Sequence, residues 1–254
     1  MDAWRDIRRL TSARIALGRS GGSLPTRERL DFQLAHARAR DAVLSAFDAR
    51  EFAERLQGIS EHVLVVQSAA RDRAEYLRRP DLGRRLARES RKSLEEMALK
   101  PPPFDLAIIA SDGLSAHAVT SQCEPLLAAL LPMIRASGWS VAPLIVAHHG
   151  RVALQDEIGE LLNATLSLML LGERPGLGSA DSLGAYFTYK PRIGHTDAER
   201  NCISNIRAGG LGIHDAAVRL HCLLGQSLRL RLSGVSLKDD GTGLPGLEVA
   251  RPLE

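Results

Sequence analysis

The sequence contains few of the residues that stabilise small secreted domains or that stack on nucleic-acid bases. Its 254 residues include three cysteines, too few for a disulfide framework, which favours a reducing compartment. Aromatic residues make up only 4% of the chain, so no stacking platform for single-stranded nucleic acid is expected. No apolar run approaches the ~20 residues that a membrane-spanning helix needs, and the N-terminus has no hydrophobic signal segment. These absences favour a soluble intracellular protein with no membrane association.

Lysine is also rare, with four residues among the 33 basic ones, whereas arginine is abundant in the stretches 5–50 and 71–91. Acidic residues alternate with these arginines, which indicates salt-bridged helix faces more than a surface that binds nucleic-acid phosphates. The planar guanidinium group of arginine also suits protein interfaces better than the point charge of lysine. We therefore expect a protein partner and no nucleic-acid partner.

Familiar catalytic signatures are absent. There is no G-x-S-x-G nucleophile elbow, no P-loop and no H-E-x-x-H pattern. His148 and His149 are adjacent, and adjacent residues of a strand point in opposite directions, so they are not expected to share a metal. Cys202 and Cys222 have no partner at C-x-x-C spacing, which argues against a zinc site. The residues alone thus predict an α/β binding module with no catalytic or metal site of its own.

The first hundred residues are expected to be mostly helical. Helices are predicted over 27–50 and 82–99, and a short β-rich run at 62–67 suits an edge strand. The three consecutive prolines at 101–103 then mark the clearest boundary in the chain.

After these prolines, strands and helices alternate. Apolar runs predict strands, and longer stretches between them predict helices, in the order 104–110 (strand), 114–136 (helix), 139–147 (strand), 154–162 (helix), 165–171 (strand), 183–189 (strand) and 213–232 (helix). Pro125 and Pro132 should break or kink the first of these helices. The alternation predicts an α/β fold, with a helical N-terminal region followed by a mainly parallel sheet.

Sheets of this kind bind ligands outside the carboxyl ends of their strands. Three loops follow predicted strands, at 111–115, 148–152 and 172–178, and the last is dense in glycine, proline and charge. Loops of that composition carry function disproportionately. A purely structural explanation stays open, because Asp112 and Ser115 could cap the next helix and the glycines could serve only the turn.

Seven stretches, in order along the chain, resemble the small (light) subunit of ethanolamine ammonia-lyase. They are LTSARIALGR (10–19), LPTR (24–27), DFQLAHARARDAV (31–43), YLRRPDLGRRL (76–86), SDGLS (111–115), GERPGLG (172–178) and NCISNI (201–206). Each stretch is short, but seven in series are highly specific.

The resemblance implies a subunit of an adenosylcobalamin-dependent lyase that converts ethanolamine to acetaldehyde and ammonia. In that family, a Rossmann-like domain of the small subunit and a large TIM-barrel subunit bind the cofactor between them, within a trimer of paired large–small dimers. Here, 1–100 would then be a helical subunit interface, 104–234 the Rossmann-like cobalamin-binding domain and 235–254 a C-terminal tail.

The resemblance also implies three cofactor contacts, at Val152, Glu173 and Cys202. Val152 would supply apolar contact to the corrin ring, Glu173 would accept hydrogen bonds from its amide arms, and Cys202 would lie close to the ring or to an arm. A structural alternative pairs Glu173 with Arg174 or Arg151 and makes Cys202 an inert core thiol. No catalytic residue and no metal ligand is expected on this chain.

Two departures from family patterns bear on cofactor and location. The sequence has no D-x-H-x-x-G motif, so the cofactor should keep its dimethylbenzimidazole on cobalt, as in the family. The chain also begins close to its first family-like stretch, which favours the cytoplasm over a bacterial microcompartment. The competing hypotheses are a non-catalytic α/β scaffold that has lost the cofactor, and a stand-alone nucleotide-binding enzyme.

Overall fold

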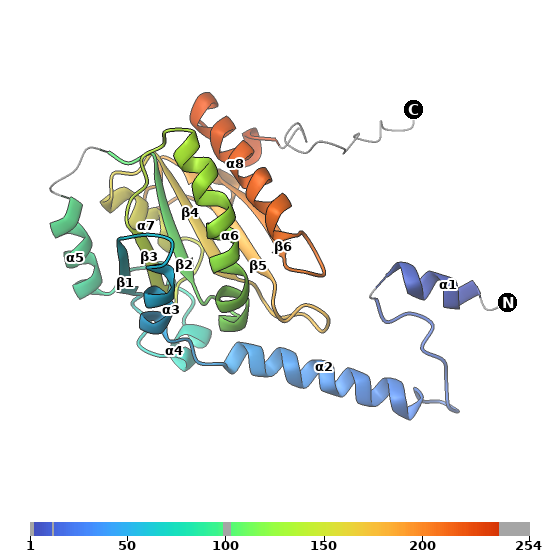
Figure 1. Cartoon of the computed structure of the whole chain (residues 1–254). Coiled ribbons are helices and arrows are strands. Elements are labelled where there is room, and N and C mark those ends of the chain that lie inside the picture. The colour runs from blue at the N-terminus through green and yellow to red at the C-terminus, as the bar shows by residue number, and fades with distance from the viewer. Residues whose placement is uncertain (1–2, 12, 99–102, 239–254) are drawn as a thin grey trace.

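Short apolar runs form the centre of a six-stranded sheet in the computed structural model, which describes residues 3–11, 13–98 and 103–238 (Figure 1). The central strands β2, β3 and β4 are almost wholly buried, as expected for strands that are covered on both faces. The strand order is β1-β3-β2-β4-β5-β6. The strand bounds are Val63–Gln67 (β1), Leu106–Ser111 (β2), Leu144–His148 (β3), Leu166–Gly172 (β4), Leu183–Tyr189 (β5) and Arg200–Ile206 (β6).

Neighbouring strands are parallel from β1 through β3 and β2 to β4, and antiparallel from β4 through β5 to β6. The predicted α/β fold with a mainly parallel sheet is therefore confirmed, with an antiparallel pair of strands added at one side. The strand predicted at 62–67 is β1, an edge strand that pairs with β3, so part of the first hundred residues belongs to this sheet.

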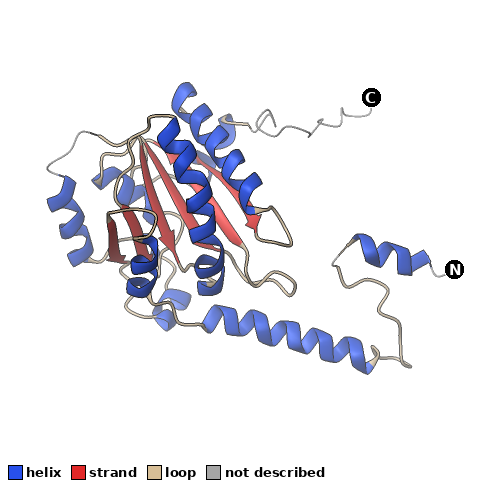
Figure 2. Cartoon of the chain, viewed as in Figure 1, coloured by secondary structure: helices blue, strands red, loops and turns tan. Residues whose placement is uncertain are grey.

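Helices cover both faces of the sheet (Figure 2). One face packs against α3 (Ala49–Leu56), α6 (Ala116–Ala136) and α8 (Ile213–Leu230), and the other against α5 (Arg88–Ala98) and α7 (Leu154–Leu161). Successive residues of β2 alternate between the two cores: Ile108 and Ala110 face the first, whereas Ala107 and Ile109 face the second. No helix in the described part of the chain is long and apolar enough to cross a membrane.

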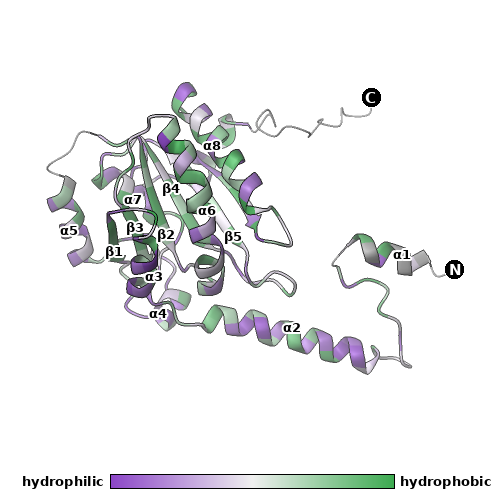
Figure 3. Cartoon of the chain, viewed as in Figure 1, coloured by the Kyte–Doolittle hydropathy of each residue, from purple (hydrophilic) through white to green (hydrophobic). Residues whose placement is uncertain are grey.

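An N-terminal arm, residues 3–44, projects from this body and consists of α1 (Ala3–Leu10), a connecting segment and α2 (Thr26–Leu44) (Figure 1). Apolar and charged residues are intermixed along α2, as Figure 3 shows. Leu30, Phe32 and Leu34 are exposed, and Ala42 is the single buried residue among those described in this helix. The arm thus leaves apolar surface that the described residues of the chain do not cover.

Two helix predictions in the first hundred residues are wrong at one end. The helix expected over 27–50 ends at Leu44, and α3 begins only at Ala49 because Asp48 caps it, accepting hydrogen bonds from two backbone N–H groups. The helix expected over 82–99 begins as the 3-10 turn η1 (Leu82–Arg84), and α5 starts at Arg88. Residue 99 lies outside the described residues.

Two predictions after the prolines at 101–103 are wrong in part. Helix α6 continues through Pro125 and Pro132, so of the break or kink expected there the break does not occur; both prolines are exposed, so water can reach the carbonyl groups that lack an N–H partner. Strand β3 begins at Leu144 rather than at 139, although Val141 forms an isolated bridge to Leu106. The other predicted elements correspond to β2, β4, β5, α7 and α8, whereas β6 and α4 (Arg73–Arg78) were not predicted.

Candidate functional site

The loops after β2 and β3 are bonded to each other at the carboxyl edge of the sheet. The carboxylate of Asp112, 1% exposed, accepts a hydrogen bond from the backbone N–H of His149 at 2.7 Å and forms an ion pair with Arg73 at 2.9 Å. The hydroxyl oxygen of Ser111 accepts a hydrogen bond from the backbone N–H of Gly150 at 2.9 Å. Asp112 therefore joins the two loops and does not cap α6, which is the role of Ser115.

The loops after β2 and β4 touch through their backbones. Gly113 has φ +52°, and a Cβ on it would lie 2.3 Å from the carbonyl oxygen of Gly172. A Cβ on Gly172 would lie 2.1 Å from the carbonyl oxygen of Ser115. The structure therefore requires glycine at 113 and at 172, and the three loops expected to carry a ligand site form one connected unit.

A pocket of about 410 Å³ opens beside this unit. Two of the three predicted cofactor residues, Val152 and Glu173, line it. Its other lining residues are the aromatic Tyr76 and Tyr186, the apolar Leu114 and Leu171, the arginines Arg151 and Arg174, and Gly172. Apolar and aromatic walls with a few polar groups are typical of small-molecule sites.

Glu173 is oriented by its neighbours on β5 and β6. Its Oε2 accepts hydrogen bonds from the hydroxyl of Ser182 at 2.5 Å and from the backbone N–H of Asn205 at 3.2 Å. Within the described residues, Oε1 has no donor, and no ion pair joins Glu173 to Arg151 or Arg174. The structural alternative that paired Glu173 with an arginine is therefore wrong.

The other side of Glu173 packs over Gly184. A Cβ at position 184 would lie 2.7 Å from the Oε1 of Glu173 and 2.8 Å from a ring carbon of Tyr186. Gly184 therefore leaves the space in which the carboxylate and the tyrosine ring lie side by side.

Cys202 lies opposite Tyr186 in the register of β5 and β6, and it is exposed, so it is not the core thiol of the structural alternative. Burial raises the pKa of Tyr186, and the neighbouring Cys202 and Glu173 raise it further. Local burial against the strands also raises the pKa of the Cys202 thiol to about 11, so it is protonated at neutral pH. Tyr186 lines the pocket with Val152 and Glu173 and is the cross-strand partner of Cys202, and it therefore links all three predicted residues.

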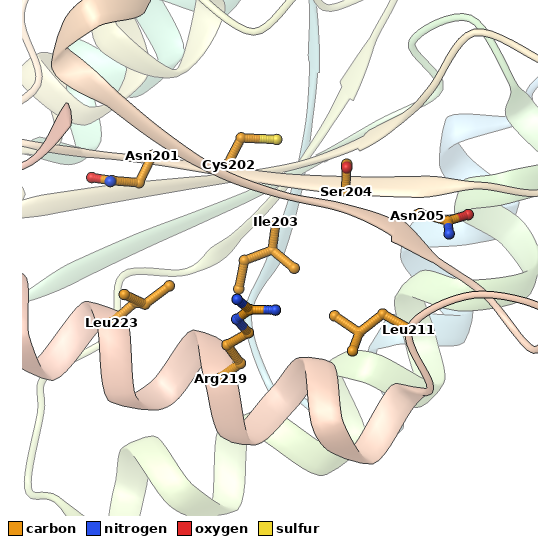
Figure 4. A pocket seen from close by; sticks show the side chains of 8 residues that line it. All are labelled: Asn201, Cys202, Ile203, Ser204, Asn205, Leu211, Arg219 and Leu223. Atoms are coloured by element: carbon orange, nitrogen blue, oxygen red, sulfur yellow. The ribbon is translucent and has the colours of Figure 1, made fainter. Parts of the chain in front are cut away.

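A second pocket, about 330 Å³, runs along β6 and is shown in Figure 4. Cys202 and Ser204 line it with Ile203, Leu211 and residues of α8, but their side chains point away from that helix. Of the three predicted cofactor residues, Cys202 therefore lines this pocket, whereas Val152 and Glu173 line the other. The Cys202 side chain thus belongs to the sheet face that carries Tyr186.

Sequence reasoning missed Tyr186 and Tyr76. The ring of Tyr76 is fully buried beneath the loop after β3, and its hydroxyl donates a hydrogen bond to the carbonyl oxygen of Gly150 at 3.2 Å. A signal was available, because tyrosine is rare in this chain, Tyr186 lies in the strand predicted over 183–189 and Tyr76 begins the family-like stretch 76–86.

The two adjacent histidines do not point in opposite directions as expected. Their ring centroids lie 4.1 Å apart with the planes nearly parallel, because His149 has left β3 with φ +58°. The side chain of Gln67 contacts a ring nitrogen of each. Among the described residues, no group of three or more His, Cys, Asp or Glu side chains could hold a metal ion.

A mixed sheet with a pocket at the carboxyl edge of its parallel strands defines the class, an α/β ligand-binding protein. A family model described as Ethanolamine ammonia-lyase light chain (EutC) matches residues 1–238. The chain belongs to this family, which confirms the resemblance seen in the seven stretches.

Curated relatives named ethanolamine ammonia-lyase small subunit agree with that assignment. The chain is 52% identical to the protein of Pseudomonas fluorescens over 93% of its own length and 87% of the relative's. For a Pseudomonas putida relative the identity is 54%, with 93% and 88% covered, and for Pseudomonas syringae pv. tomato it is 52%, with 93% and 83% covered. The chain is thus a subunit of an adenosylcobalamin-dependent ammonia-lyase, and a small subunit implies a large subunit as its partner.

Proposed function

We propose that this chain holds part of adenosylcobalamin at the carboxyl edge of its sheet, where the cofactor faces the large subunit. The complex would convert ethanolamine to acetaldehyde and ammonia, and the cofactor supplies the radical chemistry when it is bound. The observation that carries the proposal is the grouping of Val152, Glu173 and Cys202 around Tyr186.

The chemistry of the pocket lining fits part of a corrinoid. A corrin ring has broad apolar faces and a rim of amide arms. Val152, Leu114 and Leu171 supply apolar contact, and the Oε1 of Glu173, which has no donor among the described residues, can accept a hydrogen bond from an amide N–H. The pocket, about 410 Å³, is far too small to enclose a whole cobalamin. The remainder of the cofactor would therefore lie against the large subunit.

Replacing Glu173 by alanine tests the proposal. Losing one charge-assisted hydrogen bond costs about 1.5–3 kcal/mol, so the dissociation constant for adenosylcobalamin should rise about ten-fold or more. The measurement is an absorbance titration of the assembled large–small complex. Cys202→Ala should give a smaller rise, and Asp215→Ala, which removes an exposed carboxylate on α8, should give none.

Unchanged corrinoid affinity in an assembled Glu173→Ala complex would refute the role of Glu173. A complex that assembles but binds no corrinoid would instead favour the alternative function, a non-catalytic α/β scaffold.

The proposal extends to the assembly. We assign 1–100 to subunit contacts, 104–234 to the Rossmann-like cobalamin-binding domain and 235–254 to a tail, of which 239–254 lies outside the described residues. The exposed Leu30, Phe32 and Leu34 of the N-terminal arm, flanked by arginines, have the composition of an interface with an apolar centre and a charged rim. The proposed complex is a trimer of paired large–small dimers.

The proposed location is the cytoplasm, with a bacterial microcompartment as the alternative. All three cysteines are free thiols, which fits a reducing compartment.

Deleting residues 2–24 should weaken assembly with the large subunit while the sheet remains folded. The deletion removes α1 and the connecting segment, which lie outside both cores of the sheet. Sedimentation of the mixed subunits measures the assembly, and circular dichroism measures the fold. A full-length variant with serine at positions 30, 32 and 34 keeps the arm but removes its exposed apolar side chains, and it should assemble weakly as well. Normal assembly of both variants would contradict the role of the arm.

A further inference from the structure

Arg151 lies in the pocket without a carboxylate partner from the described residues. Its Nε is buried and has no hydrogen-bond acceptor, while its Nη2 donates to the carbonyl oxygen of Tyr76 at 3.1 Å. The nearby Arg73, by contrast, is paired with Asp112. Removing a guanidinium group from water without a counter-charge costs free energy. An anionic ligand group bound in the pocket would balance the charge of Arg151.

The surroundings of Arg151 fix its guanidinium group in place. The guanidinium carbon lies 4.1 Å from the centroid of the buried Tyr76 ring, within the range of a cation–π contact. The backbone N–H of Arg151 donates to the carbonyl oxygen of Gly83 at 2.7 Å, and a Cβ on Gly83 would lie 2.8 Å from the Cγ of Arg151. Tyr76 and Gly83 thus hold the planar group in one orientation before any ligand arrives.

The carboxylate that shares this pocket does not neutralise Arg151. Glu173 is held by the hydroxyl of Ser182 and the backbone N–H of Asn205, and among the described residues no ion pair joins it to Arg151. The Nη1 of Arg151 has no acceptor among the described residues. A guanidinium group binds phosphate oxygens more strongly than a neutral donor does.

We propose that Arg151 binds the phosphodiester of the cofactor's nucleotide loop, with Tyr76 as its positioning residue. The proposal rests on the proposed function. A cobalamin carries neutral amide arms and one phosphodiester, in the loop that ends in dimethylbenzimidazole. That phosphodiester is the anionic side group of the cofactor that an unpaired arginine would recognise.

The test compares three corrinoids on the complete large–small complex. Adenosylcobalamin carries both the phosphodiester and the base, adenosylcobinamide phosphate carries a phosphate without the base, and adenosylcobinamide carries neither. Dissociation constants are measured by equilibrium dialysis, without turnover. Arg151→Gln should weaken binding of the two phosphate-bearing corrinoids roughly ten- to a hundred-fold and leave adenosylcobinamide unchanged. Unchanged adenosylcobinamide binding also shows that the variant is folded and assembled.

A matched control separates the local contact from net charge. Arg229→Gln removes the same charge from an exposed position on α8. Helix α8 covers the face of the sheet opposite to the one that carries Val152 and Tyr186, so this variant should change none of the three affinities. Equal weakening of all three corrinoids by Arg151→Gln, or no weakening of any, would overturn the proposal.

The variant Glu173→Ala distinguishes a failure of the phosphodiester proposal from a failure of the proposed function. If Glu173→Ala weakens all three corrinoids while Arg151→Gln does not discriminate between them, only the phosphodiester contact is wrong. If neither variant changes any affinity, the proposed cofactor site itself is wrong, and the contact with it.

Discussion

The isolated chain is expected to give no turnover of ethanolamine with adenosylcobalamin, and mixing it with the large subunit should produce activity. Its pocket is an open depression of about 410 Å³ that can hold only part of the cofactor. Radical intermediates need a site that excludes water, and this chain alone cannot close over the reacting groups. The substrate site is expected on the large subunit.

The test measures the release of acetaldehyde and ammonia by each subunit alone and by the mixture. Each subunit alone should match the protein-free background. Deamination by the isolated chain above that background would show that the substrate site lies here. Corrinoid binding by the mixture is the control that separates an inactive preparation from an incomplete enzyme.

Replacing Arg200 by methionine should lower the free energy of unfolding by about 3–5 kcal/mol. Arg200 at the start of β6 forms an ion pair with Asp156 on α7, and each side chain is only 3% exposed. The same guanidinium group also contacts Asp197 at 3.2 Å and the carbonyl oxygen of His195 at 3.1 Å. Without Arg200, the carboxylate of Asp156 would be buried with no counter-charge.

The loss of unfolding free energy caused by Arg200→Met should depend on pH. Burial raises the pKa of Asp156 from 3.8 to about 6, even beside Arg200. An acid with a raised pKa binds its proton more tightly in the folded state than in the unfolded state. Its ionisation therefore opposes folding as the pH rises from 3.8 to about 6. Arg200 offsets that cost when Asp156 is ionised. The destabilisation of the variant should therefore be largest above pH 6 and smaller below it.

Urea unfolding at pH 5 and at pH 8 measures both effects. The double variant Asp156→Asn with Arg200→Met removes the buried charge and should be more stable than the single variant at pH 8. A loss that is the same at both pH values would contradict this account. The pair matters for the site as well, because α7 follows Val152 and β6 carries Cys202.

The sequence predicted the elements that depend on local patterns. The apolar runs of β2 and β4 are short and buried on both faces, and a parallel arrangement places their carboxyl ends at one edge. The grouping of the loops at 111–115, 148–152 and 172–178 follows from that arrangement alone. A local signal was overlooked at the end of α2, where Asp48 followed by Glu51 indicates the start of a new helix.

The sequence did not predict features that depend on pairing between distant strands. In β6, Ile203 and Ile206 both face the core although they are three residues apart, because the ladder with β5 shifts register, so the alternation typical of a strand is lost. Tyr186 meets Cys202 only through that antiparallel register. The charge state of the pocket was equally hidden, since Arg151 and Glu173 could have formed a pair by sequence alone.

The backbone contact between Gly113 and Gly172 has a consequence for protein engineering. A side chain at either glycine would collide with the backbone of the other loop, so neither loop can be exchanged by itself. A chimaera that grafts this edge onto another α/β sheet would have to transfer 111–115 and 172–173 together, with their spacing across β2 and β4 intact. The unit of transplantation is the pair of loops.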